Sequence, residues 1–120
     1  MKTPKNSQQR IIEVKTSIGY KIIDSNKVLF LEAKGKFTVI HLIDQSQIIT
    51  YHMLKWYNNN LFEPYFFRCH NSYSINCSYV NCYNSKEIVL VEGSKVPLSR
   101  SKLCYLKENL RYLIEIQDNA

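Results

Sequence analysis

Residues 66–76, with the sequence FFRCHNSYSIN, gather the side chains best suited to contact another molecule into one short segment. The segment begins with two Phe residues, and aromatic residues of this kind favour a strand. Arg, Cys, His, Asn and Ser follow at positions 68–72, where Asn and Ser favour a turn because their side chains bond the nearby backbone. A strand that ends in such a polar turn leaves hydrogen-bond donors and acceptors facing outward. The segment therefore predicts a recognition surface.

Asn71 is the strongest candidate in this turn for a contact with a nucleic-acid base, because its amide can bond adenine N6 and N7 together. The alternative is that Asn71 caps its own turn. For His70 we expect a bond to a backbone group beneath the turn, with a DNA contact as the alternative. Ser72 completes the candidate contact. Arg68 either meets phosphate or covers an apolar face.

A basic turn forms the second candidate contact. Lys34 and Lys36 flank Gly35, and a glycine lets the backbone come close to a ligand. The two lysines either bind phosphate or are ordinary surface residues of a hairpin.

The third candidate contact precedes the predicted C-terminal helix and consists of Ser99, Arg100, Ser101 and Lys102. The two positive charges and the free N–H groups of a helix start both suit a phosphate. Arg100 could instead contact guanine. The alternative is a solvated basic helix start that binds nothing.

The cysteines and histidines do not have the spacing of a metal site. Cys69, His70, Cys77 and Cys82 are close in sequence, but no C-x-x-C pair occurs, and structural zinc sites normally use such pairs. We therefore expect no metal and no cofactor. Cys69 adjoins the predicted contact turn, so its oxidation could disturb binding, but burial as an inert thiol is the expected state.

The sequence also gives no reason to expect an enzyme. It contains no G-x-S-x-G, P-loop or G-x-G-x-x-G motif. Its three histidines and ten acidic residues form no visible paired constellation.

Composition limits the class of protein. A chain of 120 residues with 45% hydrophobic residues can form one domain with one core. Its formal net charge of +6 favours a polyanionic partner, although many basic proteins of this size bind none. No apolar run approaches the roughly 18 residues of a membrane span, and residues 1–10 lack the apolar segment of a signal peptide. We expect a cytoplasmic protein with reduced thiols and no membrane partner.

Periodicity predicts the elements that position these residues. Residues 1–9 form a flexible polar leader. Short strands alternate with polar turns, which is typical of an antiparallel β fold; we place the clearest at 28–33, 37–43, 47–50, 66–70, 79–83, 87–91 and 95–98. Residues 51–61 suit a helix. A C-terminal helix of about three turns begins with Ser99 as its N-cap and carries a stripe at Leu103, Leu106, Leu110 and Leu113. The stripe faces the core or, alternatively, forms a dimer seam.

The order of these motifs resembles the LytTR-type DNA-binding domain, the output domain of many bacterial response regulators. The resemblance rests on VLFLEAKGKFTVIHL at 28–42, FFRCHNSYSIN at 66–76, SYVNCYN at 78–84, EIVLVEGSKVPLS at 87–99 and SRSKL at 99–103. It covers about residues 10–113, and we assign residues 10–120 to the domain.

The resemblance implies a mainly β, elongated fold of antiparallel sheets with a short middle helix and a C-terminal helix. It also implies a function as a sequence-specific transcription regulator of a two-component system. Loops at one edge would enter adjacent major grooves of double-stranded DNA at imperfect direct repeats, with a second protomer on the adjacent repeat. The loops would be the three candidate contacts: Lys34–Lys36, His70–Ser72 and Ser99–Lys102.

A protein-interaction module that retains the fold without binding DNA is the alternative function. The three basic segments would then not converge on one edge, or acidic residues such as Glu32 and Glu92 would cancel their field.

Overall fold

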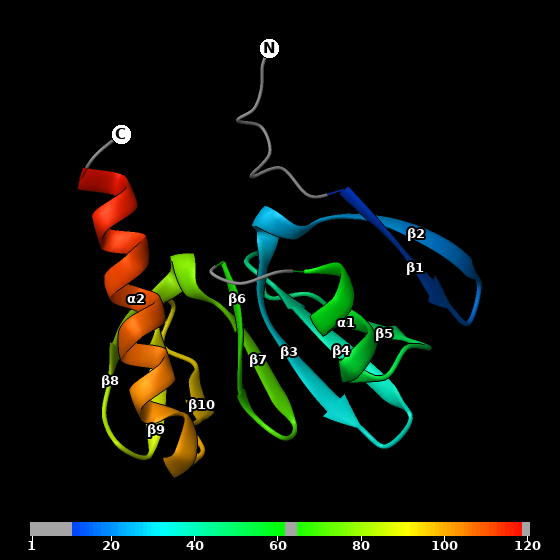
Figure 1. Cartoon of the computed structure of the whole chain (residues 1–120). Helices are drawn as coiled ribbons and strands as arrows, with labels where there is room; N and C mark the ends of the chain where they lie inside the picture. The colour runs from blue at the N-terminus through cyan, green and yellow to red at the C-terminus, as the bar shows by residue number, and fades with distance from the viewer. Residues whose placement is uncertain (1–10, 62–64, 119–120) are drawn as a thin grey trace.

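The computed structural model describes residues 11–61 and 65–118, which form three antiparallel sheets and two α-helices (Figure 1). The predicted mainly β fold with a short middle helix and a C-terminal helix is confirmed. The predicted leader at 1–9 lies outside the described residues.

Three sheets follow one another along the chain. A separate hairpin consists of β1 (Ile11–Thr16) and β2 (Gly19–Asp24). The central sheet has the order β5-β4-β3-β7-β6 and contains β3 (Val28–Lys34), β4 (Phe37–Leu42), β5 (Gln47–Thr50), β6 (Phe66–His70) and β7 (Tyr73–Asn76). The third sheet has the order β10-β9-β8 and contains β8 (Val80–Tyr83), β9 (Glu87–Leu90) and β10 (Lys95–Pro97).

The helices are α1 (Leu54–Asn60), α2 (Leu103–Asp118) and the single-turn 3₁₀-helices η2 (Ser25–Lys27), η3 (Cys77–Tyr79) and η4 (Arg100–Lys102). Among the described helices, none has the length and apolar character needed to cross a membrane.

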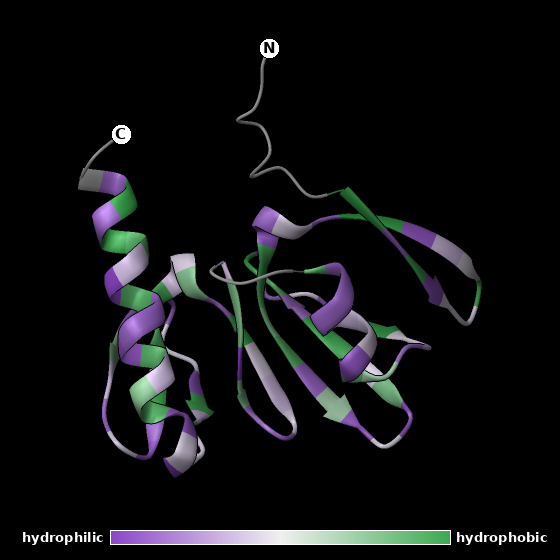
Figure 2. Ribbon diagram, in the orientation of Figure 1, coloured by the Kyte–Doolittle hydropathy of each residue, from purple (hydrophilic) through white to green (hydrophobic). Residues whose placement is uncertain are grey.

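Two hydrophobic clusters lie on opposite faces of the central sheet. Because neighbouring residues of a strand point to opposite faces, Leu31 and Phe30 of β3 belong to different clusters. Leu31 packs with residues of α1 and of the β1–β2 hairpin. Phe30 packs with residues of the third sheet and with Leu106 of α2. Hydrophobic residues recur along these strands and along α2 (Figure 2). The central sheet is thereby fixed from both sides.

The middle helix is shorter than predicted. It begins at Leu54, whereas periodicity predicted a start at residue 51. The N–H of Tyr51 donates to the carbonyl of Lys15 at 2.8 Å, and the carbonyl of His52 accepts from the Thr38 hydroxyl at 2.8 Å. These tertiary bonds hold the chain between β5 and α1 in a non-helical conformation, which outweighs the helical pattern of its side chains.

The C-terminal helix is longer than predicted, and its start is different. α2 alone has 16 residues, more than four turns, and η4 precedes it. Ser99 occupies the predicted N-cap position, at the start of η4, but its side chain makes no capping hydrogen bond. The backbone N–H of Ser99 instead donates to the carbonyl of Cys69 at 2.8 Å.

The leucine stripe of α2 packs against its own domain. Leu106 is fully buried, and the other three leucines are half-buried against the same cluster. The core-facing interpretation is therefore confirmed.

We predict that Leu106→Ala lowers the free energy of unfolding by about 2–5 kcal/mol, because it removes a fully buried side chain and leaves a cavity. Ile114→Ala, on the same helix with 57% of its surface exposed, should cost less than about 0.5 kcal/mol. Urea unfolding followed by circular dichroism measures both. Equal losses in the two variants would contradict the packing of α2 described above.

Candidate nucleic-acid interface

The β3–β4 turn presents two lysines at one end of the central sheet. Lys34 ends β3, Gly35 has a φ of +63°, and Lys36 precedes β4. The positive φ explains the glycine, because other residues rarely adopt this backbone conformation. Both lysines are exposed. The sequence-based prediction of a hairpin turn with outward basic groups is confirmed, while phosphate binding stays a prediction.

A β-bulge shapes the turn between β6 and β7. The pairing with β7 shifts between Arg68 and His70, so Cys69 is the extra residue of β6. Cys69 is completely buried, and its thiol lies 3.5 Å from the carbonyl of Pro97. Burial raises the pKa of this thiol to about 12, which keeps it protonated and unreactive. The expected inert burial of Cys69 is confirmed.

His70 closes the turn that follows the bulge. Its Nδ1 accepts a hydrogen bond of 3.1 Å from the backbone N–H of Ser72. The guanidinium of Arg68 donates to the carbonyl of Asn71 at 2.6 Å. The backbone bond predicted for His70 is thus present. Arg68, whose role the sequence left open, fixes the backbone of the turn.

The Asn71 side chain remains available. It is exposed, and its amide makes no hydrogen bond with any described residue. The capping role that the sequence offered as an alternative for Asn71 belongs instead to His70, one position earlier. The backbone of Asn71 is held by Arg68 while the Asn71 amide faces solvent, which is a suitable arrangement for contacting a base.

The third candidate segment adjoins this turn. The bond from the Ser99 N–H to the Cys69 carbonyl attaches it to β6. Arg100 and Ser101 are exposed, while Lys102 is half-buried with its ammonium 6.0 Å from the centre of the Tyr105 ring.

Backbone hydrogen bonds align all three segments at one end of the molecule. The N–H of Ala33, just before the β3–β4 turn, donates to the carbonyl of Ser72 at 2.8 Å. The bond between Ser99 and Cys69 joins the third segment to the same corner. In Figure 1 the β3–β4 turn, the β6–β7 turn and the start of α2 all lie at the lower end of the view. The structure therefore brings the three segments together.

The structure adds a basic residue that the sequence analysis did not single out. The carbonyl of Lys86, in the turn between β8 and β9, accepts from the N–H of Leu98 at 2.9 Å. Lys86 is exposed, and its bonding partner Leu98 directly precedes Ser99 in the chain. The sequence predicted the turn between β8 and β9. Only the pairing of β9 with β10 shows that this turn lies at the same end of the molecule as Ser99.

Two acidic residues named in the sequence analysis have different positions. Glu92 lies in the β9–β10 turn, at the opposite end of that hairpin from Leu98 and Ser99, and accepts bonds from Ser94. Glu32 lies beside the β3–β4 turn, with one carboxylate oxygen 3.5 Å from the Lys34 ammonium.

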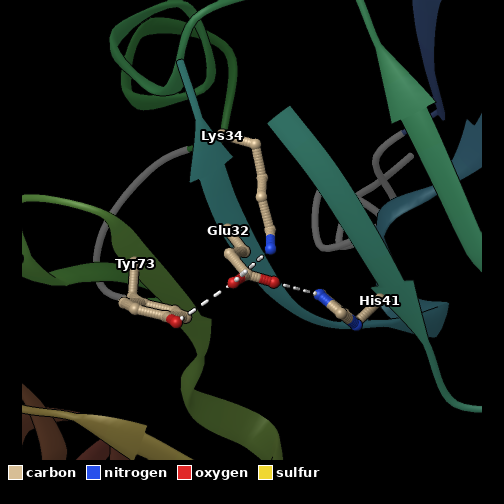
Figure 3. A network of polar contacts seen from close by, with 4 residues as sticks. All are labelled: Glu32, Lys34, His41 and Tyr73. Carbon is tan, nitrogen blue, oxygen red and sulfur yellow. Dashed lines mark hydrogen bonds and ion pairs between the residues drawn. The ribbon is translucent and has the colours of Figure 1, made fainter. Parts of the chain in front are cut away.

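Glu32 is the centre of a polar network that joins three strands (Figure 3). One carboxylate oxygen lies 2.9 Å from His41 Nε2 on β4, and the other accepts from the Tyr73 hydroxyl on β7 at 3.1 Å. The His41 ring stacks on Phe30, with centroids 4.1 Å apart. Although burial acts to raise the pKa of Glu32, these hydrogen bonds and the charge of Lys34 hold it below its usual value. The carboxylate is therefore ionised at neutral pH.

Metal ligands are not clustered in the described part of the chain. Over residues 11–61 and 65–118, no three His, Cys, Asp or Glu side chains lie together in a way that could hold an ion.

Comparisons with known proteins agree with this geometry. A family model for the LytTr DNA-binding domain matches residues 19–111. Among solved structures, the chain is similar to the LytTr DNA-binding domain of a Bacillus cereus protein described as a methyl-accepting/DNA response regulator. The two chains have 25% sequence identity and a TM-score of 0.71, over 84% of this chain and 96% of the other. No curated protein sequence matches the chain.

We predict that the stability contributed by Glu32 depends on pH. Since the pKa of Glu32 is lower in the folded state, its contribution is present above the ordinary value of 4.5 and is lost as pH falls through the folded value. At pH 6, Glu32→Gln should lower the free energy of unfolding by about 1 kcal/mol. The gap between the two proteins should narrow as the pH falls below 4.5 and close once Glu32 is protonated in the folded state. Urea unfolding at half-unit pH steps measures it, and a gap that stays constant would contradict the network.

Proposed function

Because the chain belongs to the LytTr DNA-binding domain family, we propose that it is a sequence-specific DNA-binding domain of a bacterial transcription regulator. The family is one of DNA-binding domains and not of enzymes. The observation that carries the proposal is the alignment of three basic segments at one end of the domain by the Ala33–Ser72 and Ser99–Cys69 backbone bonds.

Phosphate contacts would position the domain on the duplex. The groups for this role are the exposed or half-exposed cations of the first and third segments: Lys34, Lys36, Arg100 and Lys102. Hydroxyl groups of Ser72, Ser99 and Ser101 lie beside them and suit phosphate oxygens. Such contacts fix register and orientation but carry no sequence information.

Asn71 would supply the sequence-specific contact. Its amide can donate to N7 of adenine and accept from the N6 amino group of the same base. This pair of bonds discriminates against other bases. Arg100 is the second candidate, because a guanidinium can bond guanine O6 and N7 together. His70 would act through the turn, since its ring nitrogen holds the Ser72 N–H.

The binding site would be an imperfect direct repeat. By resemblance to the family, two protomers would occupy adjacent repeats on one face of the duplex, each with its turns in a major groove. A receiver or sensor elsewhere in the regulator would control occupancy.

The alternative function, a protein-interaction module without DNA binding, has less support. It requires that the basic segments do not converge on one edge, or that acidic residues cancel their positive field. The segments share one end of the molecule, and Glu92 lies at the opposite end of its hairpin. Glu32 lies close to Lys34, but one carboxylate offsets at most one of the four cations Lys34, Lys36, Arg100 and Lys102.

We expect the protein to enrich a repeated motif from a pool of random duplexes, sequenced after binding at two salt concentrations. Three to four phosphate contacts per protomer should give a slope of log affinity against log salt of roughly −3 to −4. Binding without enrichment would contradict base recognition. Absence of binding at low salt would contradict DNA binding altogether and favour the interaction module.

Asn71→Ala should weaken binding to the enriched site by about 1–3 kcal/mol while leaving binding to random duplex and the salt slope unchanged. The matched control is Asn59→Ala, an exposed asparagine of α1, on the opposite side of the central sheet from α2. Fluorescence anisotropy with both duplexes measures the four affinities. If Asn71→Ala weakens both duplexes equally, Asn71 does not contact a base.

A further inference from the structure

Glu32 places a negative charge beside the cations that the proposed function assigns to phosphate. Only 19% of its side chain is exposed, whereas the Lys34 side chain is 62% exposed. Lys34 is therefore free to move toward a phosphate, but Glu32 is held in position by Tyr73 and His41. A fixed carboxylate at this place offsets part of the Lys34 charge that a phosphate would otherwise meet, whatever the base sequence.

The same carboxylate connects the two turns that the proposed function uses. Lys34 belongs to the β3–β4 turn, and Tyr73 directly follows the turn that carries Asn71. Glu32 and Tyr73 are also direct partners in the pairing of β3 with β7. The side-chain bond between them therefore reinforces the backbone bond from Ala33 to Ser72.

We propose that Glu32 is a specificity-determining residue: it offsets the charge of Lys34, which limits binding to random DNA, and it holds Tyr73, which keeps the Asn71 turn in register. This inference rests on the proposed DNA-binding function. The two effects act in the same direction. Weaker sequence-independent attraction and a better fixed base contact both increase the ratio of specific to non-specific affinity.

Glu32→Gln tests the first effect, because the amide keeps the shape and an acceptor for Tyr73 but removes the charge. Affinity for a random duplex should rise about three- to ten-fold at low salt, with a salt slope steeper by about one, since Lys34 becomes able to neutralise a phosphate fully. Affinity for the enriched site should rise less, so that the specificity ratio falls. Circular dichroism at neutral pH verifies that the variant is folded.

Glu92→Gln is the matched control. It changes the net charge by the same amount and also alters a carboxylate bonded within a turn, but at the far end of the β9–β10 hairpin. In 0.1 M salt it should change either affinity by less than about two-fold, because it lies at the end of the hairpin opposite Lys86 and Leu98 and salt screens charges separated by more than about 10 Å. An equal rise in the two variants would show a net-charge effect and overturn the inference.

A double-mutant cycle locates the effect at Lys34. In a Lys34→Gln background, Glu32→Gln should raise random-duplex affinity by less than about two-fold, because the cation it releases is absent. A full rise in that background would overturn the role of Lys34.

Tyr73→Phe tests the second effect, since it removes the hydroxyl bond to Glu32 without changing the charge. Affinity for the enriched site should fall about two- to five-fold while random-duplex affinity stays constant. Equal losses on both duplexes would overturn the positioning role.

If the wild-type protein binds no DNA at low salt, the proposed function fails and this inference with it. If the wild-type protein binds DNA and the variants behave like their control, only this inference fails.

Discussion

The hydrogen bond from the Ser99 N–H to the Cys69 carbonyl determines how the two ends of the proposed DNA surface meet. It is 2.8 Å long and joins the segment before α2 to β6. It is possible because the bulge leaves Cys69 without a partner on β7. A buried carbonyl without a partner costs about 1–3 kcal/mol, so the N–H of Ser99 is held firmly in this place. One extra residue in β6 thus positions Arg100 and Lys102 beside the Asn71 turn.

The rest of the fold makes this junction rigid. Phe67, Cys69 and Ile75 pack against Leu98 and Leu106, so that both sides of the Ser99–Cys69 bond are anchored in one cluster. The opposite face of the central sheet is covered by α1 and the β1–β2 hairpin. A second anchor lies at the far end of β7. There the buried Asn76 amide donates to the carbonyl of Val28 at 2.9 Å and its oxygen accepts from the N–H of Ser78. Side chains that protrude from such a scaffold lose little conformational entropy on binding.

The sequence predicted the local features well because they depend on local chemistry. The apolar and β-branched runs at 28–33 and 37–43 and the glycine between two lysines are sufficient to predict β3, β4 and their turn. The features it missed depend on contacts between distant residues. Neither the bulge at Cys69 nor the non-helical chain at Tyr51 can be deduced from neighbouring residues, because each is completed by a hydrogen bond with a distant residue, Ser99 or Lys15. The exchange of roles between His70 and Asn71 has the same origin. Both side chains can accept from a backbone N–H two positions on, and only the geometry of the bulged strand selects His70.

This exchange matters for recognition, because His70 holds the turn and the Asn71 side chain is left to contact DNA. In the free protein, water satisfies the exposed Asn71 amide, so leaving it without a protein partner costs nothing. When a groove excludes that water, the amide must find both a donor and an acceptor on the base edge, and adenine offers both. Another base leaves one group unpaired, at a cost of about 1–3 kcal/mol. The discrimination proposed for Asn71 therefore depends as much on the loss of water as on the bond itself. It also depends on Arg68 and His70, which hold the turn so that Asn71 cannot move away from an unsuitable base.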